Sequence, residues 1–291
     1  MLPIIFIHSR NHNYLPLSLL KAKESNPGSD VILLGDGQNA HLGSIVHHFH
    51  HLKYAKQATE LAKVFVNFST NPSDFELICL QRWMILLDFL DENKIDQCLY
   101  LDSDVLLFDE MVSDAQRFQT YGMTVAGISG HTNFIHGRNT LERFCKHIQN
   151  AYTQPEARLI LEDKYKVFRQ YHEAGGISDM TFFTEFRAEN PVSILDISEP
   201  IEGRMFDITI AYTHGVKAEN GIKKLTWEEN RPYAESLTGD EIEMRSLHFQ
   251  GDSKRYMKQM AGNLSVTGES LYQLNTQYVL GQKVWNKLIR Q

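Results

Sequence analysis

Residues 98–108 read CLYLDSDVLLF, an apolar run, two carboxylates two positions apart, and a second apolar run. A short continuous apolar run is typical of a strand that is buried on both faces. In an extended chain Asp102 and Asp104 project to the same side, about 7 Å apart at roughly 3.3 Å per residue. Two carboxylates at the end of a buried strand are costly unless a cation lies between them. The stretch therefore predicts a divalent-metal site at the end of a central strand, and solvated acids in a turn are the alternative.

The flanking sequence places this strand in an α/β fold. Apolar segments at residues 4–8 and 31–34 are separated by a helical pattern at 15–24, which predicts a βαβ unit and a parallel sheet. A largely apolar helix is predicted over 75–90, directly before the Asp102 strand. In such sheets ligands bind at the carboxyl ends of the strands. Asp102 and Asp104 therefore lie where a ligand is expected.

The second half of the chain predicts helices and short strands. Helices are expected over 141–152, 155–172, 180–186 and 271–289, and β-like segments over 193–197, 206–212, 222–227 and 245–249. We expect one domain over residues 1–262 and a helical tail over 263–291. The domain has a mostly parallel central sheet flanked by helices, with a smaller β segment near the C-terminus.

Composition limits the class of protein. The 291 residues are 42% hydrophobic and 22% charged, an ordinary globular balance. The formal net charge of −7 argues against a nucleic-acid-binding face. Three cysteines in apolar contexts indicate reduced thiols, and the N-terminal apolar run is too short for a signal peptide or a membrane span. We therefore expect a cytoplasmic protein.

Residues 47–51 read HHFHH, a composition that suggests metal binding at first sight. In a strand these histidines divide between the two faces, and in a helix only pairs such as His47 and His51 align. Neither arrangement brings three ligands to one point. We interpret the run as an exposed strand and loop near the edge of the sheet.

A late motif, LHFQGDSK at residues 247–254, completes a recognisable pattern. Together with the Asp102 strand and the preceding helix, which carries Arg82, it resembles the nucleotide-sugar glycosyltransferases of the GT-A fold. The resemblance is strongest to glycosyltransferase family 8, the group of glycogenin and the bacterial lipopolysaccharide galactosyl- and glucosyltransferases, and it spans residues 3–257. It implies a Rossmann-like GT-A fold. It also implies transfer of a hexose from a UDP-sugar to a saccharide or other hydroxyl acceptor, with retention of anomeric configuration.

The resemblance implies a three-residue metal site formed by Asp102, Asp104 and His248. Two carboxylates and one imidazole suit Mn²⁺, and Mg²⁺ tolerates the imidazole less well. Lys254 would place a point charge on the donor diphosphate. Gly251 would allow close approach of the backbone.

Further positions match residues that bind the donor in this family. The pair Asn13 and Tyr14 matches a nucleotide-binding Asn-Tyr, in which the aromatic ring stacks on the uracil. Arg82 matches an arginine that contacts the donor, and Ser103 matches a residue that reaches toward the ribose. The loop before Asn13 is longer than in the family and lacks its aspartate.

Asn133 and Asp179 match positions that contact the donor sugar, although only one residue of each family motif is present. An N-cap role is the alternative for Asp179. If the enzyme inverts the anomeric centre, a carboxylate must act as base, and Asp179 and Asp207 are the candidates.

Two alternative functions and the role of the C-terminal tail also have to be considered. A nucleotidyltransferase or phosphotransferase would also use paired acids, but neither a Walker A motif nor GxGxxG is present. A binding protein without activity is disfavoured by the intact set of site residues. The tail combines apolar and basic residues over 280–290, so it packs on the domain or associates weakly with a membrane surface.

Overall fold

The computed structural model describes residues 1–262 and 264–289 and divides the chain into two compact units. Unit 1 comprises Met1–Phe49, Leu101–Asp114 and Ile197–Gln291, and unit 2 comprises His50–Tyr100 and Ala115–Asp196. The predicted metal ligands therefore belong to unit 1, whereas Arg82, Asn133 and Asp179 belong to unit 2. The predicted division after residue 262 stays a prediction.

The fold is α/β, as predicted. The strands of the larger sheet are β1 (Ile4–Ile7), β2 (Val31–Gly35), β3 (His47–His50), β4 (Cys98–Leu101), β6 (Met123–Val125), β7 (Thr132–Ile135) and β8 (Ile194–Asp196). Their order is β3-β2-β1-β4-β7-β6-β8. β1 pairs with β2 and β6 with β8 in parallel, while β6 and β7 are antiparallel. The histidine run contributes β3, the first strand in this order, which confirms its predicted place at the sheet edge.

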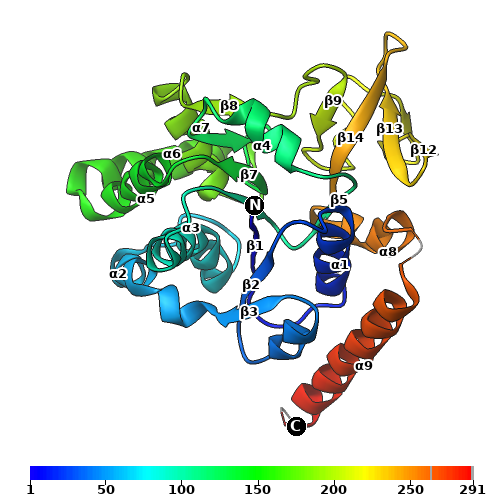
Figure 1. Cartoon of the computed structure of the whole chain (residues 1–291). Coiled ribbons are helices and arrows are strands. Elements are labelled where there is room, and N and C mark those ends of the chain that lie inside the picture. Colours follow the sequence, from blue (N-terminus) through cyan, green and yellow to red (C-terminus); the bar gives the residue numbers. More distant parts are fainter. Residues whose placement is uncertain (263, 290–291) are drawn as a thin grey trace. The chain divides into compact units, whose positions relative to one another are not determined.

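Unit 1 contains the predicted βαβ unit and a smaller sheet (Figure 1). Helix α1 (Leu15–Ser25) connects β1 to β2, which are in register from Ile4 opposite Val31 to Ile7 opposite Leu34. The strands of the smaller sheet are β5 (Val105–Leu107), β9 (Arg204–Phe206), β12 (Leu225–Glu228), β13 (Arg231–Glu235) and β14 (Glu241–His248). Their order is β12-β13-β14-β5, and β9 also pairs with β14. The predicted smaller β segment near the C-terminus is thus confirmed.

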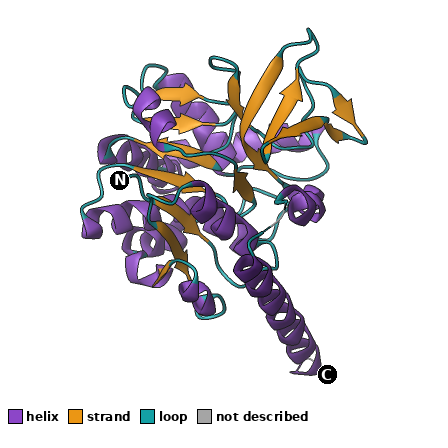
Figure 2. Cartoon of the chain, turned by 45° about the vertical axis from the view of Figure 1, so that its right-hand side comes forward, coloured by secondary structure: helices purple, strands orange, loops and turns teal. Residues whose placement is uncertain are grey.

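The remaining elements of unit 1 are short except for one long helix. They are the hairpin β10 (Ala218–Glu219) and β11 (Ile222–Lys223), the 3₁₀ turns η1 (Ala40–Ser44) and η3 (Gly251–Tyr256), and the helices α8 (Met257–Met260) and α9 (Val266–Ile289). Figure 2 shows α9 as one continuous helix. Apolar side chains of α1, β5, β9, β14 and α8 form one buried cluster, which includes Leu17, Leu106, Met205, Leu247 and Met257. This cluster fixes β14 against β5.

Unit 2 is mainly helical around its strands. Its elements are η2 (His51–Tyr54), α2 (Lys56–Val64), α3 (Ser73–Asn93), α5 (Arg138–Thr153), α6 (Pro155–Tyr171) and α7 (Asp179–Glu189); α4 (Val112–Phe118) begins in unit 1. Trp83 of α3 is fully buried, and its ring contacts those of Tyr100, Phe144 and Phe183. The predicted helix over 75–90 is therefore confirmed as a core helix.

Two local predictions were wrong. The strand predicted over 206–212 ends at Phe206, because Asp207 bonds to Lys223 and to the backbone N–H of His248 instead of continuing a ladder. The DxD motif does not stay extended. The N–H of Val105 donates to the carbonyl of Asp102 over 3.1 Å, so the chain turns between β4 and β5. The two carboxylates are brought close by this turn and not by strand alternation.

Candidate metal and nucleotide site

The turn between β4 and β5 carries both aspartates of the DxD motif. It is held by α1, since the hydroxyl of Ser18 donates to the carbonyl of Ser103 over 2.6 Å. It is also held by β14, since the N–H of Phe249 donates to the carbonyl of Asp104 over 2.9 Å. Asp102 and Asp104 are partly exposed, whereas Ser103 between them is buried. The turn therefore presents two carboxylates on a fixed backbone.

Pairing between β5 and β14 brings His248 to these carboxylates. The strands are antiparallel, and His248 lies opposite Val105, the residue after Asp104. The ligand atoms of Asp102, Asp104 and His248 all lie within 4.8 Å of one another. With metal–ligand bonds of about 2.1 Å, neighbouring and opposite ligand atoms on one ion are about 3–4 Å apart. Two carboxylates and one imidazole gathered within 4.8 Å are a donor set suited to one divalent ion, and the binding of that ion stays a prediction.

The ring of His248 is oriented for such a role. Its Nδ1 lies 2.5 Å from the carbonyl of Ile208, and because a carbonyl oxygen can only accept, Nδ1 carries the proton. The other nitrogen, Nε2, faces Asp104 Oδ1 at 3.5 Å. A histidine that binds a metal is commonly held in this way through its second nitrogen.

The protonation states of Asp104 and His248 depend on each other. Burial alone would raise the pKa of Asp104, but the hydrogen bonds and charges of His248 and Lys254 hold it below its ordinary value. Burial alone would lower the pKa of His248, and Asp104 raises it instead. The carboxylate is therefore kept ionised, which is the form that binds a cation.

Asp207 lies behind His248 and does not suit the base role that the sequence suggested. It is fully buried, its Oδ1 lies 2.6 Å from Lys223 Nζ, and its Oδ2 accepts the backbone N–H of His248 over 3.0 Å. Lys223, itself 2% exposed, also donates to the carbonyl of Thr209 over 2.8 Å. A buried carboxylate bound in this way cannot reach an acceptor hydroxyl. We correct its role to that of a support for His248.

Lys254 reaches the same carboxylate from the late motif. Its Nζ lies 2.6 Å from Asp104 Oδ2 and 5.5 Å from the centre of the Tyr14 ring. The turn that carries it begins at Gly251, whose φ of +59° favours glycine. The structure thus brings Lys254, Tyr14 and the three predicted metal ligands together.

Two histidines that were not predicted as site residues, His8 and His12, lie beside Ser103 and Tyr14. His8 Nδ1 lies 2.8 Å from the hydroxyl of Ser103, and His8 Nε2 lies 2.8 Å from His12 Nδ1. The ring of His12 stacks on that of Tyr14 at 5.3 Å between centroids. Burial, followed by the charge of the neighbouring His12, lowers the pKa of His8 to about 3, so the His8 ring is neutral near pH 7. The only sequence signal was the unusual loop HSRNHNY at residues 8–14.

Asn13 and Tyr14 end up in different surroundings. The side chain of Asn13 is exposed, whereas Tyr14 is half-buried beside the DxD turn. Burial and the nearby Asp104 carboxylate raise the pKa of the Tyr14 hydroxyl. Tyr14 therefore presents a neutral aromatic ring near the candidate metal ligands, and its stacking on a base stays a prediction.

The predicted donor residues of unit 2 form a separate set of contacts. Arg82 of α3 donates to Asp179 Oδ2 over 2.5 Å, and the indole N–H of Trp83 donates to the same oxygen over 3.2 Å. Ser178, and not Asp179, is the N-cap of α7, with a reciprocal capping box to Thr181. The structure therefore joins two predicted residues, Arg82 and Asp179, by an ion pair.

Asn133 lies in β7 and is fully buried. Its Oδ1 accepts the N–H of Thr124 over 3.2 Å, while its Nδ2 is buried without a hydrogen-bond partner among the described residues. A buried amide N–H₂ with unused capacity is costly unless a partner arrives. Its contribution to sugar binding stays a prediction.

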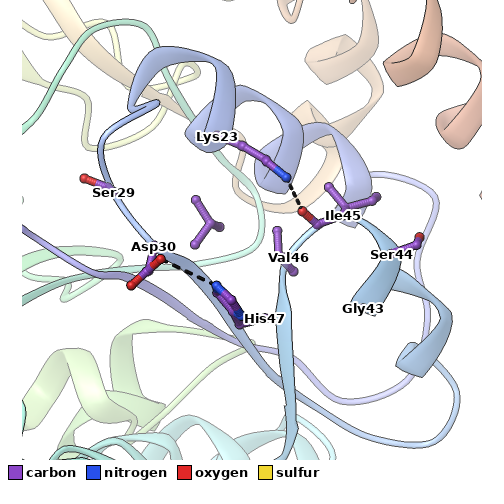
Figure 3. A pocket seen from close by; sticks show the side chains of 9 residues that line it. Lys23, Ser29, Asp30, Gly43, Ser44, Ile45, Val46 and His47 are labelled. Atoms are coloured by element: carbon purple, nitrogen blue, oxygen red, sulfur yellow. Dashed lines mark hydrogen bonds and ion pairs between the residues drawn. The ribbon is translucent and has the colours of Figure 1, made fainter.

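A cavity of about 260 Å³ in unit 1 is lined by none of these residues (Figure 3). Its charged groups already have partners. Lys23 donates to the carbonyl of Ile45 over 2.6 Å, and Asp30 lies 3.5 Å from His47. We therefore assign no function to it. Within residues 1–262 and 264–289, no helix is both long and apolar enough to span a bilayer.

Comparison with known proteins gives likenesses of fold. No family model and no curated protein matches this sequence. Among solved structures, mouse xyloside xylosyltransferase 1 is 12% identical with a TM-score of 0.46, over 74% of this chain and 90% of that one. An active-site mutant of LgtC is 11% identical with a TM-score of 0.45, over 91% and 97%. Glycosyltransferase GlyE of Streptococcus pneumoniae is 10% identical with a TM-score of 0.41, over 94% and 63%. At such values the likeness carries no conclusion about activity, which depends on the residues of the site.

Proposed function

We propose that this chain is a metal-dependent glycosyltransferase that moves a hexose from a UDP-sugar to a saccharide or other hydroxyl acceptor. The observation that carries the proposal is the convergence of Asp102, Asp104 and His248 within 4.8 Å. Lys254 and the Tyr14 ring beside them supply the other groups that a nucleoside diphosphate needs, a cation for phosphate and a face for the base.

In this proposal the triad holds Mn²⁺, which as a Lewis acid would stabilise the departing diphosphate. The chain's own groups prepare that site. Asp207 accepts the backbone N–H of His248, and the carbonyl of Ile208 accepts from Nδ1 of its ring, which leaves Nε2 facing Asp104. Lys254 would exchange its bond to Asp104 for one to the diphosphate, placing positive charge where negative charge develops.

We further propose that Arg82, Asp179 and Asn133 contact the donor sugar, and that Ser103 contacts the ribose. Retention of anomeric configuration is part of the proposal, because Asp207 is unsuited to act as base and Asp179 is already bonded to Arg82 and Trp83. Assignment of the product anomer by NMR tests this. A β-linked product from an α-linked donor would contradict retention.

Calorimetric titration of UDP with and without Mn²⁺ tests the proposed function. We expect binding to require the ion, and Asp104→Asn to weaken it by about 100-fold or more. Asp252→Asn is the matched control, because Asp252 is an exposed carboxylate of the same late motif. Absence of both metal-dependent UDP binding and turnover of any UDP-sugar would refute the proposal.

Thermal-shift screening of UDP-sugars with Mn²⁺ would identify the donor, because a ligand that binds the folded state raises its melting temperature. Cytoplasmic action with weak membrane-surface association of the tail is also proposed. Side chains 284–291 lie outside those that the structure describes. Co-sedimentation with anionic vesicles, comparing the full chain with one truncated after Lys283, tests the association.

A further inference from the structure

The loop at residues 8–14, which carries His8, His12 and Tyr14, is bound from two sides by buried asparagines. On one side Asn39, which is fully buried, donates from Nδ2 to the carbonyls of His8 over 2.8 Å and Arg10 over 2.7 Å. Its Oδ1 accepts the N–H of Asp36 over 2.9 Å. Asn39 therefore ties the start of the loop to the end of β2.

Arg10 shows that this loop is constrained. Its φ is +68°, a left-handed conformation that costs a non-glycine residue about 1–2 kcal/mol. Its N–H donates to Asp36 Oδ2 over 2.6 Å, and its carbonyl is the one that Asn39 binds. Such a conformation persists only where the surroundings impose it, and it is common in loops that hold ligands.

On the other side the loop is bound by the C-terminal helix α9. Asn275 is 1% exposed, and its Oδ1 accepts from Asn11 Nδ2 over 2.9 Å and lies 2.7 Å from His41 Nε2. Its Nδ2 donates to the carbonyl of His12 over 3.2 Å. One buried amide thus uses both ends to hold two consecutive loop residues. This is the geometry of a positioning group and not of incidental packing.

These contacts form a continuous path from α9 to the DxD turn. Asn275 holds the backbone of His12, His12 contacts His8, and His8 contacts the hydroxyl of Ser103. Ser103 lies between the two aspartates of the triad, and Tyr14 stacks on His12. Loss of the Asn275 contacts would therefore free the part of the loop that carries His12 and Tyr14.

We propose that α9 is a working part of the donor site, and that Asn275 is a positioning residue that sets the loop at residues 8–14 for the nucleotide. This inference rests on the proposed function, because the ligand of the loop is taken to be the nucleoside part of the donor. It assigns the C-terminal helix a role distinct from association with a membrane. It also assigns different ligands to two parts of the site: Asp102, Asp104 and His248 bind the ion, and the loop supported by α9 binds the nucleoside.

Three variants test the proposal: Asn275→Ala, Asn11→Ala and the double substitution. UDP affinity in the presence of Mn²⁺ should fall about tenfold in Asn275→Ala, whereas Mn²⁺ affinity without UDP should change by less than about twofold. Because Asn11 acts through Asn275, the double variant should lose no more than Asn275→Ala alone. Leu274→Ala, at a 61% exposed position of the same helix, is the matched control.

Hydrogen exchange of the amides at residues 8–14 is the second readout, and it does not depend on any ligand. Exchange should accelerate in Asn275→Ala and stay unchanged in Leu274→Ala. Unchanged exchange in Asn275→Ala, unchanged UDP affinity, or an equal loss in the control would overturn the inference. If the wild-type chain binds no UDP, the proposed function fails, and the exchange experiment still decides whether α9 positions the loop.

Discussion

Two aspartate–lysine pairs in unit 1 have the same length and opposite surroundings. Asp207 and Lys223 are 2.6 Å apart with side chains 0% and 2% exposed, and Asp104 and Lys254 are 2.6 Å apart with side chains 14% and 30% exposed. The buried pair has further backbone partners and fixes His248. The accessible pair includes Asp104, one of the three candidate metal ligands, and its partly exposed side chains leave room for a partner to be exchanged. Distance alone therefore does not distinguish the two ion pairs, whereas access to solvent does.

The most stringent test of the difference between the two pairs removes the buried cation, Lys223. Lys223→Met leaves the Asp207 carboxylate buried without its partner, and we expect a loss of about 3–5 kcal/mol in the free energy of unfolding, measured with urea. The double variant Asp207→Asn with Lys223→Met should recover much of that loss. A loss below about 1 kcal/mol in the single variant would show that water or another group compensates the charge.

Lowering the pH should reduce the free energy of unfolding through His8, a neutral histidine whose pKa is influenced by burial and by Asp104 and Lys254. Because the pKa of His8 is lowered from 6.5 to about 3, the unfolded chain binds a proton first, and stability falls as pH falls through this window. Between about pH 6.5 and about pH 5 the expected loss from His8 is about 1.5 kcal/mol.

Urea unfolding of His8→Asn at both pH values measures that contribution, because the substitution removes the titrating group. The matched control is His214→Asn, at an exposed histidine of the same unit, which should keep the wild-type pH dependence. Equal pH dependence in wild type and His8→Asn would contradict the neutral state of the half-buried His8.

Removal of the accessible cation should change ligand binding more than stability. In Lys254→Met we expect less than about 1 kcal/mol lost on unfolding, because the pair is partly solvated. Mn²⁺ alone should bind a few-fold tighter, since a competing cation has left Asp104, and UDP with Mn²⁺ should bind about tenfold weaker. Calorimetric titration of each ligand distinguishes the two effects. Weaker binding of Mn²⁺ alone would contradict the competition between lysine and metal.

The smallest effect is expected at an exposed pair of the same length in unit 2. Lys53 and Glu92 are 2.6 Å apart, with side chains 61% and 51% exposed. Lys53→Met should leave the free energy of unfolding unchanged within the error of the measurement, because both side chains are solvated. Urea titration in low and high salt measures it. A loss close to that of Lys223→Met would remove solvent access as the variable that separates these pairs.

Local pattern was sufficient to predict much of the fold. The apolar runs of β1, β2 and β4 and the helical spacing of α1 and α3 are properties of adjacent residues, so their elements could be predicted from the sequence. The turn at Asp102–Asp104 and the end of β9 at Phe206 were missed. Both are imposed by residues distant in the chain, Ser18 and Phe249 in one case and Lys223 in the other.

The candidate site shows the same limit. Asp102, Asp104, His248 and Lys254 were predicted together, because their motifs resemble those of a known family, and the structure places them together. His8, His12 and the supporting role of Asp207 were not predicted. Their function depends on side-chain contacts with Ser103 and His248 that no local spacing reveals.

The antiparallel contact between the three-residue β5 and the end of β14 also has a kinetic consequence. It joins Asp104 to His248 across about half of the chain, so a long loop must close before the third candidate ligand arrives. During refolding, tight capture of Mn²⁺ should therefore lag behind the recovery of helical circular dichroism. The time course of Mn²⁺ capture would then report when β5 and β14 pair during refolding.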